Sequence, residues 1–133
     1  MAYTISIDPD KRVIRVDFRG DVTFSLVKEA AREVWQKRFK GGPYRYLSIL
    51  LDAQLRFKTT ELLALQEFYE SIGISKEMRN AIVIPQNDKI IEDATIHEIA
   101  ASLENWHIKI FMDIQQAETW LMQCNDEMEP TTI

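Results

Sequence analysis

The side chains of this sequence that could do chemistry are its histidines, its single cysteine and a few carboxylates. The segment Ile96-His97-Glu98-Ile99-Ala100-Ala101 begins like the helix motif of zinc proteases. That motif needs a second histidine one turn after the first, where this chain has Ala101. His107 is the only other histidine, so the sequence predicts no metal site. We expect His97 on a helix surface and His107 at the start of a strand.

No nucleophile and base stand together in the sequence. Cys124 continues the apolar stripe of the last expected helix, which indicates a packed residue. Glu67 and Glu70 fall on the polar stripe of an earlier helix, where we expect them to be solvated. Asp52 directly follows an apolar run, at the kind of strand end where α/β proteins place binding loops. We expect Asp52 to contact a ligand or to form a turn or cap, and we expect no enzyme and no cofactor.

The elements that must position these side chains alternate along the chain. Period-two patterns and short apolar runs predict five strands, and apolar residues at helical spacing predict four helices. The expected strands cover residues 3–7, 14–18, 46–52, 80–85 and 107–112. The expected helices run from Thr23 to about Arg38, from about Thr59 to Ile72, from Asn87 or Asp88 to about Glu104, and from Asp113 to Cys124.

This order, ββαβαβαβα, predicts a single α/β domain over residues 1–124 and a polar tail over 125–133. The first two strands form an antiparallel hairpin, and the others add to a mixed, mostly parallel sheet. Right-handed crossovers laid down in one direction would put the helices on one face of that sheet. The other face would then be less covered, with an apolar band of Leu50, Val83 and Phe111 as a possible homodimer contact. Polar residues expected on that face are Thr4, Ser6, Arg15, Asp17, Ser48 and Lys109.

Composition narrows the class of protein. The 133 residues are 46% hydrophobic and 28% charged, as in ordinary globular domains. The net charge of -5 disfavours nucleic acid as a partner, because phosphate contacts need clustered Lys and Arg. We expect no transmembrane segment and no secretory signal, since no run is apolar enough and the start lacks a basic region before an apolar core. One cysteine fits a reducing, cytoplasmic location.

The same features resemble a known superfamily. The element order, an interior strand ending in Asp52, a short loop and a hydroxyl-capped helix are similar to the STAS superfamily, most closely its SpoIIAA-like branch. The likeness covers residues 3 to 122. It extends to the strand 81–85 and to the ending 108–113 followed by Ala117-Glu118-Thr119-Trp120-Leu121.

The resemblance implies a regulatory phosphorylation site. In anti-sigma-factor antagonists of this superfamily, a serine at the start of the second helix is phosphorylated by a partner kinase. The matching segment is Lys58-Thr59-Thr60-Glu61, which places Thr60, or its neighbour Thr59, at the phosphoacceptor position. Lys58 replaces an acidic residue and Glu61 replaces a glycine, and a phosphate beside Glu61 would be repelled. Capping of the helix by Thr59 or Thr60 is the alternative that we favour.

We expect one of two functions. The first is a non-catalytic module that binds a partner protein through the loop 53–61, with Asp52 and Lys58 as contacts. The alternative is a carrier or sensor of a small nonpolar ligand, because relatives of this branch have been linked to nonpolar molecules. Its expected pocket, between the second and third helices, is lined by Phe68, Tyr69, Ile99 and Leu103.

Overall fold

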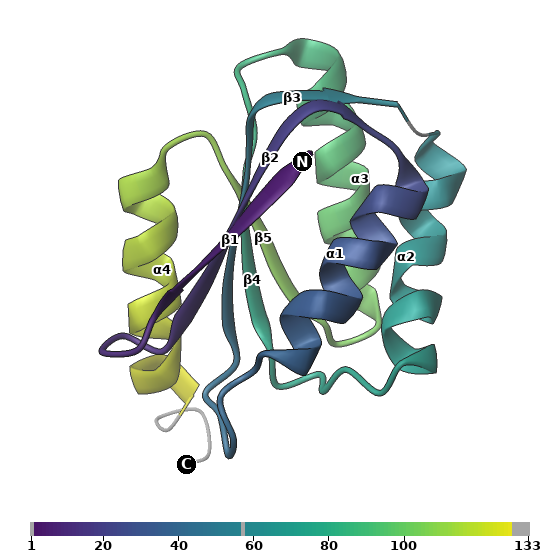
Figure 1. Cartoon of the computed structure of the whole chain (residues 1–133). Coiled ribbons are helices and arrows are strands. Elements are labelled where there is room, and N and C mark those ends of the chain that lie inside the picture. Colours follow the sequence, from purple (N-terminus) through teal and green to yellow (C-terminus); the bar gives the residue numbers. More distant parts are fainter. Residues whose placement is uncertain (1, 57, 129–133) are drawn as a thin grey trace.

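The computed structural model of this chain describes residues 2–56 and 58–128, with side chains throughout except at 59, 62 and 124–128. The order of elements is the predicted ββαβαβαβα (Figure 1). The strands are β1 (Tyr3–Asp8), β2 (Val13–Val22), β3 (Arg45–Leu55), β4 (Arg79–Val83) and β5 (His107–Phe111). The helices are α1 (Phe24–Gln36), α2 (Thr59–Ser71), α3 (Asp88–Leu103) and α4 (Ile114–Met128).

The five strands form one sheet in chain order, β1-β2-β3-β4-β5. β1 runs antiparallel to β2, and the pairs β2–β3, β3–β4 and β4–β5 are parallel. Each parallel strand is therefore added on the same side of the one before. Crossovers of one hand then place α1, α2 and α3 together on one face, as predicted (Figure 1).

The opposite face is covered by α4, which the sequence did not lead us to expect. α4 follows the last strand and so belongs to no crossover, and it packs on β3, β4 and β5 from the other side (Figure 1). Its buried Ala117 and Leu121 join Val83 and the partly buried Phe111 in a second core cluster. Leu50 lies on the α1–α3 face instead. The predicted exposed apolar band is therefore wrong. The homodimer stays a prediction, but this band cannot be its contact surface.

The polar side of the sheet is placed partly as predicted. Thr4, Ser6, Arg15 and Asp17 alternate with buried residues of β1 and β2 that face α1–α3, and so lie on the α4 side of the sheet. Arg15 and Asp17 form an ion pair there at 2.8 Å between Nε and Oδ2. Ser48 was expected with them, but it lines the space beneath α1–α3.

A bulge extends β3 beyond its predicted end. Asp17 pairs with Ile49, whereas the next recorded pair joins Arg19 to Asp52, so β3 holds one more residue than β2 across this step. Strand pairing then continues to Leu55. The predicted loop is therefore wrong over residues 53–55. Asp52 is an exposed strand residue rather than a turn or cap.

Side-chain caps fix three of the helix starts. In each case the side-chain oxygen accepts a hydrogen bond from the backbone N–H three residues later, at 2.9 to 3.2 Å. The capping residues are the predicted Thr23, Asn87 and Asp113. α2 stops just before Gly73, the predicted end signal, whose φ of +81° suits a residue without a side chain. α4 reaches Met128, so the start of the segment expected as a tail is helical; the Cys124 side chain and residues 129–133 lie outside the described part.

The α4 contact can be tested by truncating its buried anchor. Leu121 is 0% exposed and packs against β3 and β4, so Leu121→Ala is expected to lower the free energy of unfolding by about 2–5 kcal/mol. Its neighbour Met122, 37% exposed, is a matched control, and Met122→Ala is expected to cost less than about 0.5 kcal/mol. Urea denaturation of both variants measures the difference. Equal effects would contradict the packing of α4 described here.

Candidate functional site

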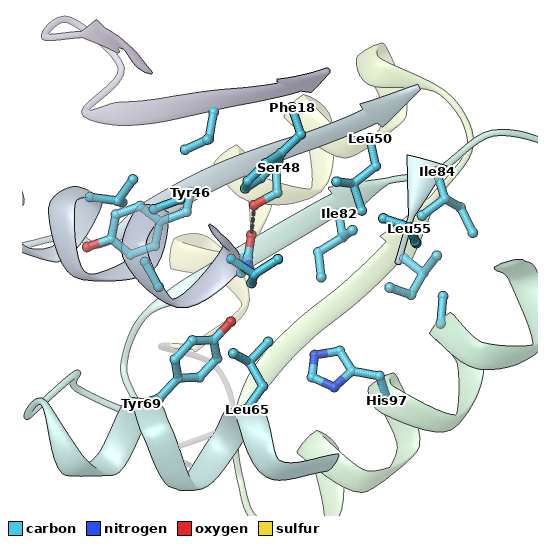
Figure 2. A pocket seen from close by; sticks show the side chains of 18 of the residues that line it. Phe18, Tyr46, Ser48, Leu50, Leu55, Leu65, Tyr69, Ile82, Ile84 and His97 are labelled. Atoms are coloured by element: carbon cyan, nitrogen blue, oxygen red, sulfur yellow. Dashed lines mark hydrogen bonds between the residues drawn. The ribbon is translucent and has the colours of Figure 1, made fainter. Parts of the chain in front are cut away.

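A cavity of about 130 Å³ lies between the sheet and the layer formed by α1, α2 and α3 (Figure 2). Its size is close to that of an engineered apolar cavity of about 150 Å³ that stays dry and binds benzene. The lining side chains come from all three helices and from the sheet. They include Val27, Ala30, Ala31, Val34, Leu65, Tyr69, Ile90, Ala94, His97, Tyr46, Ser48, Leu50, Ile82, Ile84 and Ile110.

Small side chains on the helices account for the space. Ala30 and Ala31 on α1 and Ala94 on α3 face the sheet across the cavity. Protein interiors are normally packed as densely as organic crystals, so larger residues would be expected where helices meet a sheet. With alanine at these positions, the helical layer leaves a gap that the sheet side chains do not fill.

The bulge in β3 brings both halves of that strand to the cavity. Ser48 and Leu50 line it before the bulge, and Leu55 lines it afterwards. These residues could not all point to one face in a regular strand, because successive side chains alternate. The extra residue reverses the alternation, so Leu55 faces the helices and Asp52 faces the other way.

A hydrogen-bonded polar pair interrupts the apolar wall on the sheet side. The Ser48 hydroxyl donates to Asn80 Oδ1 at 2.9 Å, joining the neighbouring strands β3 and β4 (Figure 2). Asn80 is buried and lines the cavity with Ser48. With Oδ1 engaged, the donor group of the amide, Nδ2, is left for another acceptor.

Tyr69 on α2 directs its hydroxyl into the cavity (Figure 2). Its side chain is 5% exposed, and its ring packs edge-on against Trp106, with centroids 5.6 Å apart. Burial raises the pKa of Tyr69 above its ordinary value, so the phenol is neutral at physiological pH. Among the described residues, the hydroxyl has no hydrogen-bond partner. It is a donor aimed at the space where a ligand would lie.

His97 on α3 is buried with its ring in the cavity wall (Figure 2). The prediction of a surface histidine was therefore wrong. The sequence did carry a signal, because Ile90, Ala94, His97 and Ala101 recur at the spacing of one helix face. Asp93, one turn before His97, also lines the cavity and reaches Lys89 at the surface at 3.2 Å.

The four residues predicted to form an apolar pocket do not come together. Tyr69 alone lines the cavity. Phe68 lies on the α1–α2 surface, with Lys28 and Arg32 over its ring at 5.7 and 5.3 Å from the centroid. Ile99 and Leu103 are 56% and 81% exposed, on the outer side of α3. The cavity lies on the opposite, sheet-facing side of the helices.

The predicted contact edge lies at the start of α2. Lys58 occupies the N-cap position and α2 begins at Thr59, so the predicted capping by Thr59 or Thr60 was wrong. Glu61 makes the capping contact instead, as its carboxylate accepts a hydrogen bond from the Lys58 N–H at 2.9 Å. Asp52, Lys58 and Thr60 are all exposed, whereas the Thr59 side chain is outside the described residues. Phosphorylation of Thr60 stays a prediction.

A row of basic residues crosses the sheet on its α4 side, at the strand starts. Arg45, Arg79 and His107 stand side by side in the register of β3, β4 and β5. Arg45 Nη1 donates to the Lys11 carbonyl at 2.6 Å, and Arg79 is buried. Burial, and then the charge of Arg79, lower the pKa of His107. Burial of these arginines could not be predicted from their residue type, since Arg is rarely buried.

The described parts of the chain show neither a cluster of metal ligands nor a membrane-spanning helix. They contain no group of three or more His, Cys, Asp or Glu side chains placed to hold a metal ion. None of their helices combines the length and the apolar character needed to cross a bilayer.

Comparisons with known proteins identify the fold. No family model matches the chain, and no curated protein matches it by sequence. A solved structure does match: the crystal structure of an uncharacterized protein from the DUF3478 family with a SpoIIAA-like fold, from Shewanella loihica PV-4. The TM-score is 0.56 at 19% identity, over 90% of this chain and 92% of the other. The chain thus has a SpoIIAA-like α/β fold, which confirms the predicted fold class.

The capping contact of α2 can be tested with two adjacent substitutions. Glu61→Ala removes the acceptor for the Lys58 N–H and a negative charge near the helix N-terminus. It is expected to lower the free energy of unfolding by about 1 kcal/mol. Thr60→Ala is the matched control and is expected to change it by less than about 0.5 kcal/mol. A larger loss in Thr60→Ala, measured by urea denaturation, would restore Thr60 as the stabilising residue.

Proposed function

We propose that this protein binds a small apolar molecule in the cavity beneath α1, α2 and α3, and acts as its carrier or sensor. The observation that carries the proposal is the cavity itself, which is lined mainly by aliphatic and aromatic side chains. Ligand sites are typically concave and mostly apolar, with a small number of polar groups that fix the orientation of the ligand. Here these groups are Ser48, Asn80, Tyr69, Asp93 and His97.

The energetics of an unfilled cavity support this role. The side chains that line an unfilled apolar cavity lack dispersion contacts on the side that faces the empty space. A ligand that fills the space restores the lost dispersion contacts and removes its own apolar surface from water. Binding would therefore stabilise the folded protein in proportion to ligand concentration and affinity.

We propose binding without chemistry. Acyl or group transfer by a serine needs a base within hydrogen-bond reach of its hydroxyl. The Ser48 hydroxyl donates instead to the Asn80 amide oxygen, and an amide is not a base in the physiological range. Tyr69 is held in its neutral form, so it can donate a hydrogen bond but cannot serve as a phenolate nucleophile.

The second candidate is a regulatory module that binds a partner protein at the start of α2. It is supported by the exposure of Asp52, Lys58 and Thr60 where β3 ends and α2 begins. Loops and helix ends at the carboxyl edge of a parallel sheet are common binding positions in α/β proteins. The single cysteine supports a cytoplasmic location for either role.

Filling the cavity provides a test of the first proposal. Ala94→Leu adds a branched side chain in the cavity wall, so it is expected to abolish binding of a small apolar probe such as isopropylbenzene. It is also expected to keep or raise the melting temperature, because the added side chain occupies existing space. Isothermal titration calorimetry and thermal unfolding measure the two effects.

Ala100→Leu is the matched control, because Ala100 is also a partly buried residue of α3 but does not line the cavity. It is expected to bind the probe as the unmodified protein does. If the unmodified protein fails to bind apolar probes of this size, or if Ala94→Leu binds them equally well, the cavity is not the ligand site.

A further inference from the structure

We infer that the ligand is a neutral molecule with a hydrogen-bond-accepting oxygen, and that the Tyr69 hydroxyl recognises this oxygen. The inference rests on the proposed function and specifies its ligand class. It starts from the Tyr69 phenol, which points into the cavity (Figure 2) and packs its ring against Trp106. A fixed ring gives the hydroxyl a defined position at which to meet a ligand.

The Tyr69 hydroxyl lacks a partner among the described residues although the side chain is 5% exposed. A buried polar group without a hydrogen bond costs about 1–3 kcal/mol, and most such groups in folded proteins are paired. A purely apolar ligand would shield the hydroxyl from any water and leave it unpaired. A ligand oxygen within reach would restore the hydrogen bond.

The Asn80 side chain also offers the ligand a hydrogen-bond donor. Its Oδ1 already accepts from Ser48, so the part of the amide that is left to interact is the donor Nδ2. The buried Tyr69 and Asn80 therefore both offer donors at the cavity wall. These two donors favour a carbonyl, ether or hydroxyl oxygen on the ligand.

The charges around the cavity favour a neutral ligand over a carboxylate. No Lys or Arg is among the described residues that line the cavity. Among the described lining residues, only His97 has a basic side chain, and it lies one turn from the Asp93 carboxylate on the same helix. An anion would have to be desolvated next to a carboxylate without a fixed positive charge to compensate for it.

Three probes of the same branched shape test the inference: acetophenone, isopropylbenzene and benzoate. Acetophenone carries a neutral acceptor, isopropylbenzene has none, and benzoate is anionic. The unmodified protein is expected to bind acetophenone about fivefold more tightly than isopropylbenzene, which corresponds to one net hydrogen bond. Benzoate is expected not to bind measurably. Isothermal titration calorimetry gives the three affinities.

Tyr69→Phe removes the hydroxyl and keeps the ring that packs on Trp106. It is expected to remove the preference for acetophenone, while isopropylbenzene binds as before. Tyr44→Phe is the matched control, because Tyr44 packs against Trp35 without lining the cavity, and it is expected to keep the preference. Thermal unfolding checks that both variants are folded.

The outcomes separate this inference from the proposed function. If the probes bind but the unmodified protein shows no preference, or Tyr69→Phe keeps it, recognition by the hydroxyl is wrong and apolar binding stands. If benzoate binds as tightly as acetophenone, only the claim that the ligand is neutral is overturned. If none of the three probes binds, both proposals are overturned. If Tyr69→Phe fails to fold, the test is whether the unmodified protein binds acetophenone more tightly than isopropylbenzene. Equal affinities would then overturn the inference.

Discussion

One extra residue in β3 determines how the central strand divides its side chains between the two layers of the protein. Before the bulge, Ser48 faces the three helices while Leu47 and Ile49 face α4. After the bulge, Ala53 and Leu55 face the helices. Side chains of a regular strand alternate between the two faces, so without the bulge Leu55 would point toward the other face. The extra residue shifts the alternation by one, and the strand can line the cavity along its length.

The two faces of the sheet play different physical roles. α4 closes one face with small and branched residues that leave Val83 and Leu121 with no exposed surface. On the other face, α1 and α3 present alanines to the sheet, and the layer encloses space instead of filling it. The face that carries α1–α3 also holds the larger cluster of buried residues, so the cavity lies beside a packed core.

The sequence predicted the features that depend on local patterns. The element order and the caps at Thr23, Asn87 and Asp113 follow from residues within one turn of each helix start. The end of β3 could not be found in the same way, because a bulge depends on pairing with β2, which is remote in the chain. The face covered by α4 was missed for a related reason, since no later strand constrains a helix that ends the fold.

The pocket residues show a second limit of sequence reading. α3 carries apolar residues around most of its circumference, so the pattern does not indicate which side meets the sheet. Ile99 and Leu103 were chosen from the side that is exposed, whereas Ala94 and His97 face the cavity. The presence of a cavity depends on the fit between helices and sheet, which no single element determines.

Both proposed roles involve α2, which gives them a physical connection. Its start carries the exposed Lys58 and Thr60, and its next turns present Leu65 and Tyr69 to the cavity. A ligand that contacts these two side chains would stabilise one position of the helix over others. If a partner at the first turn prefers the same position, each would strengthen the binding of the other by the same factor. Carrier and regulatory module would then be two descriptions of one linked equilibrium.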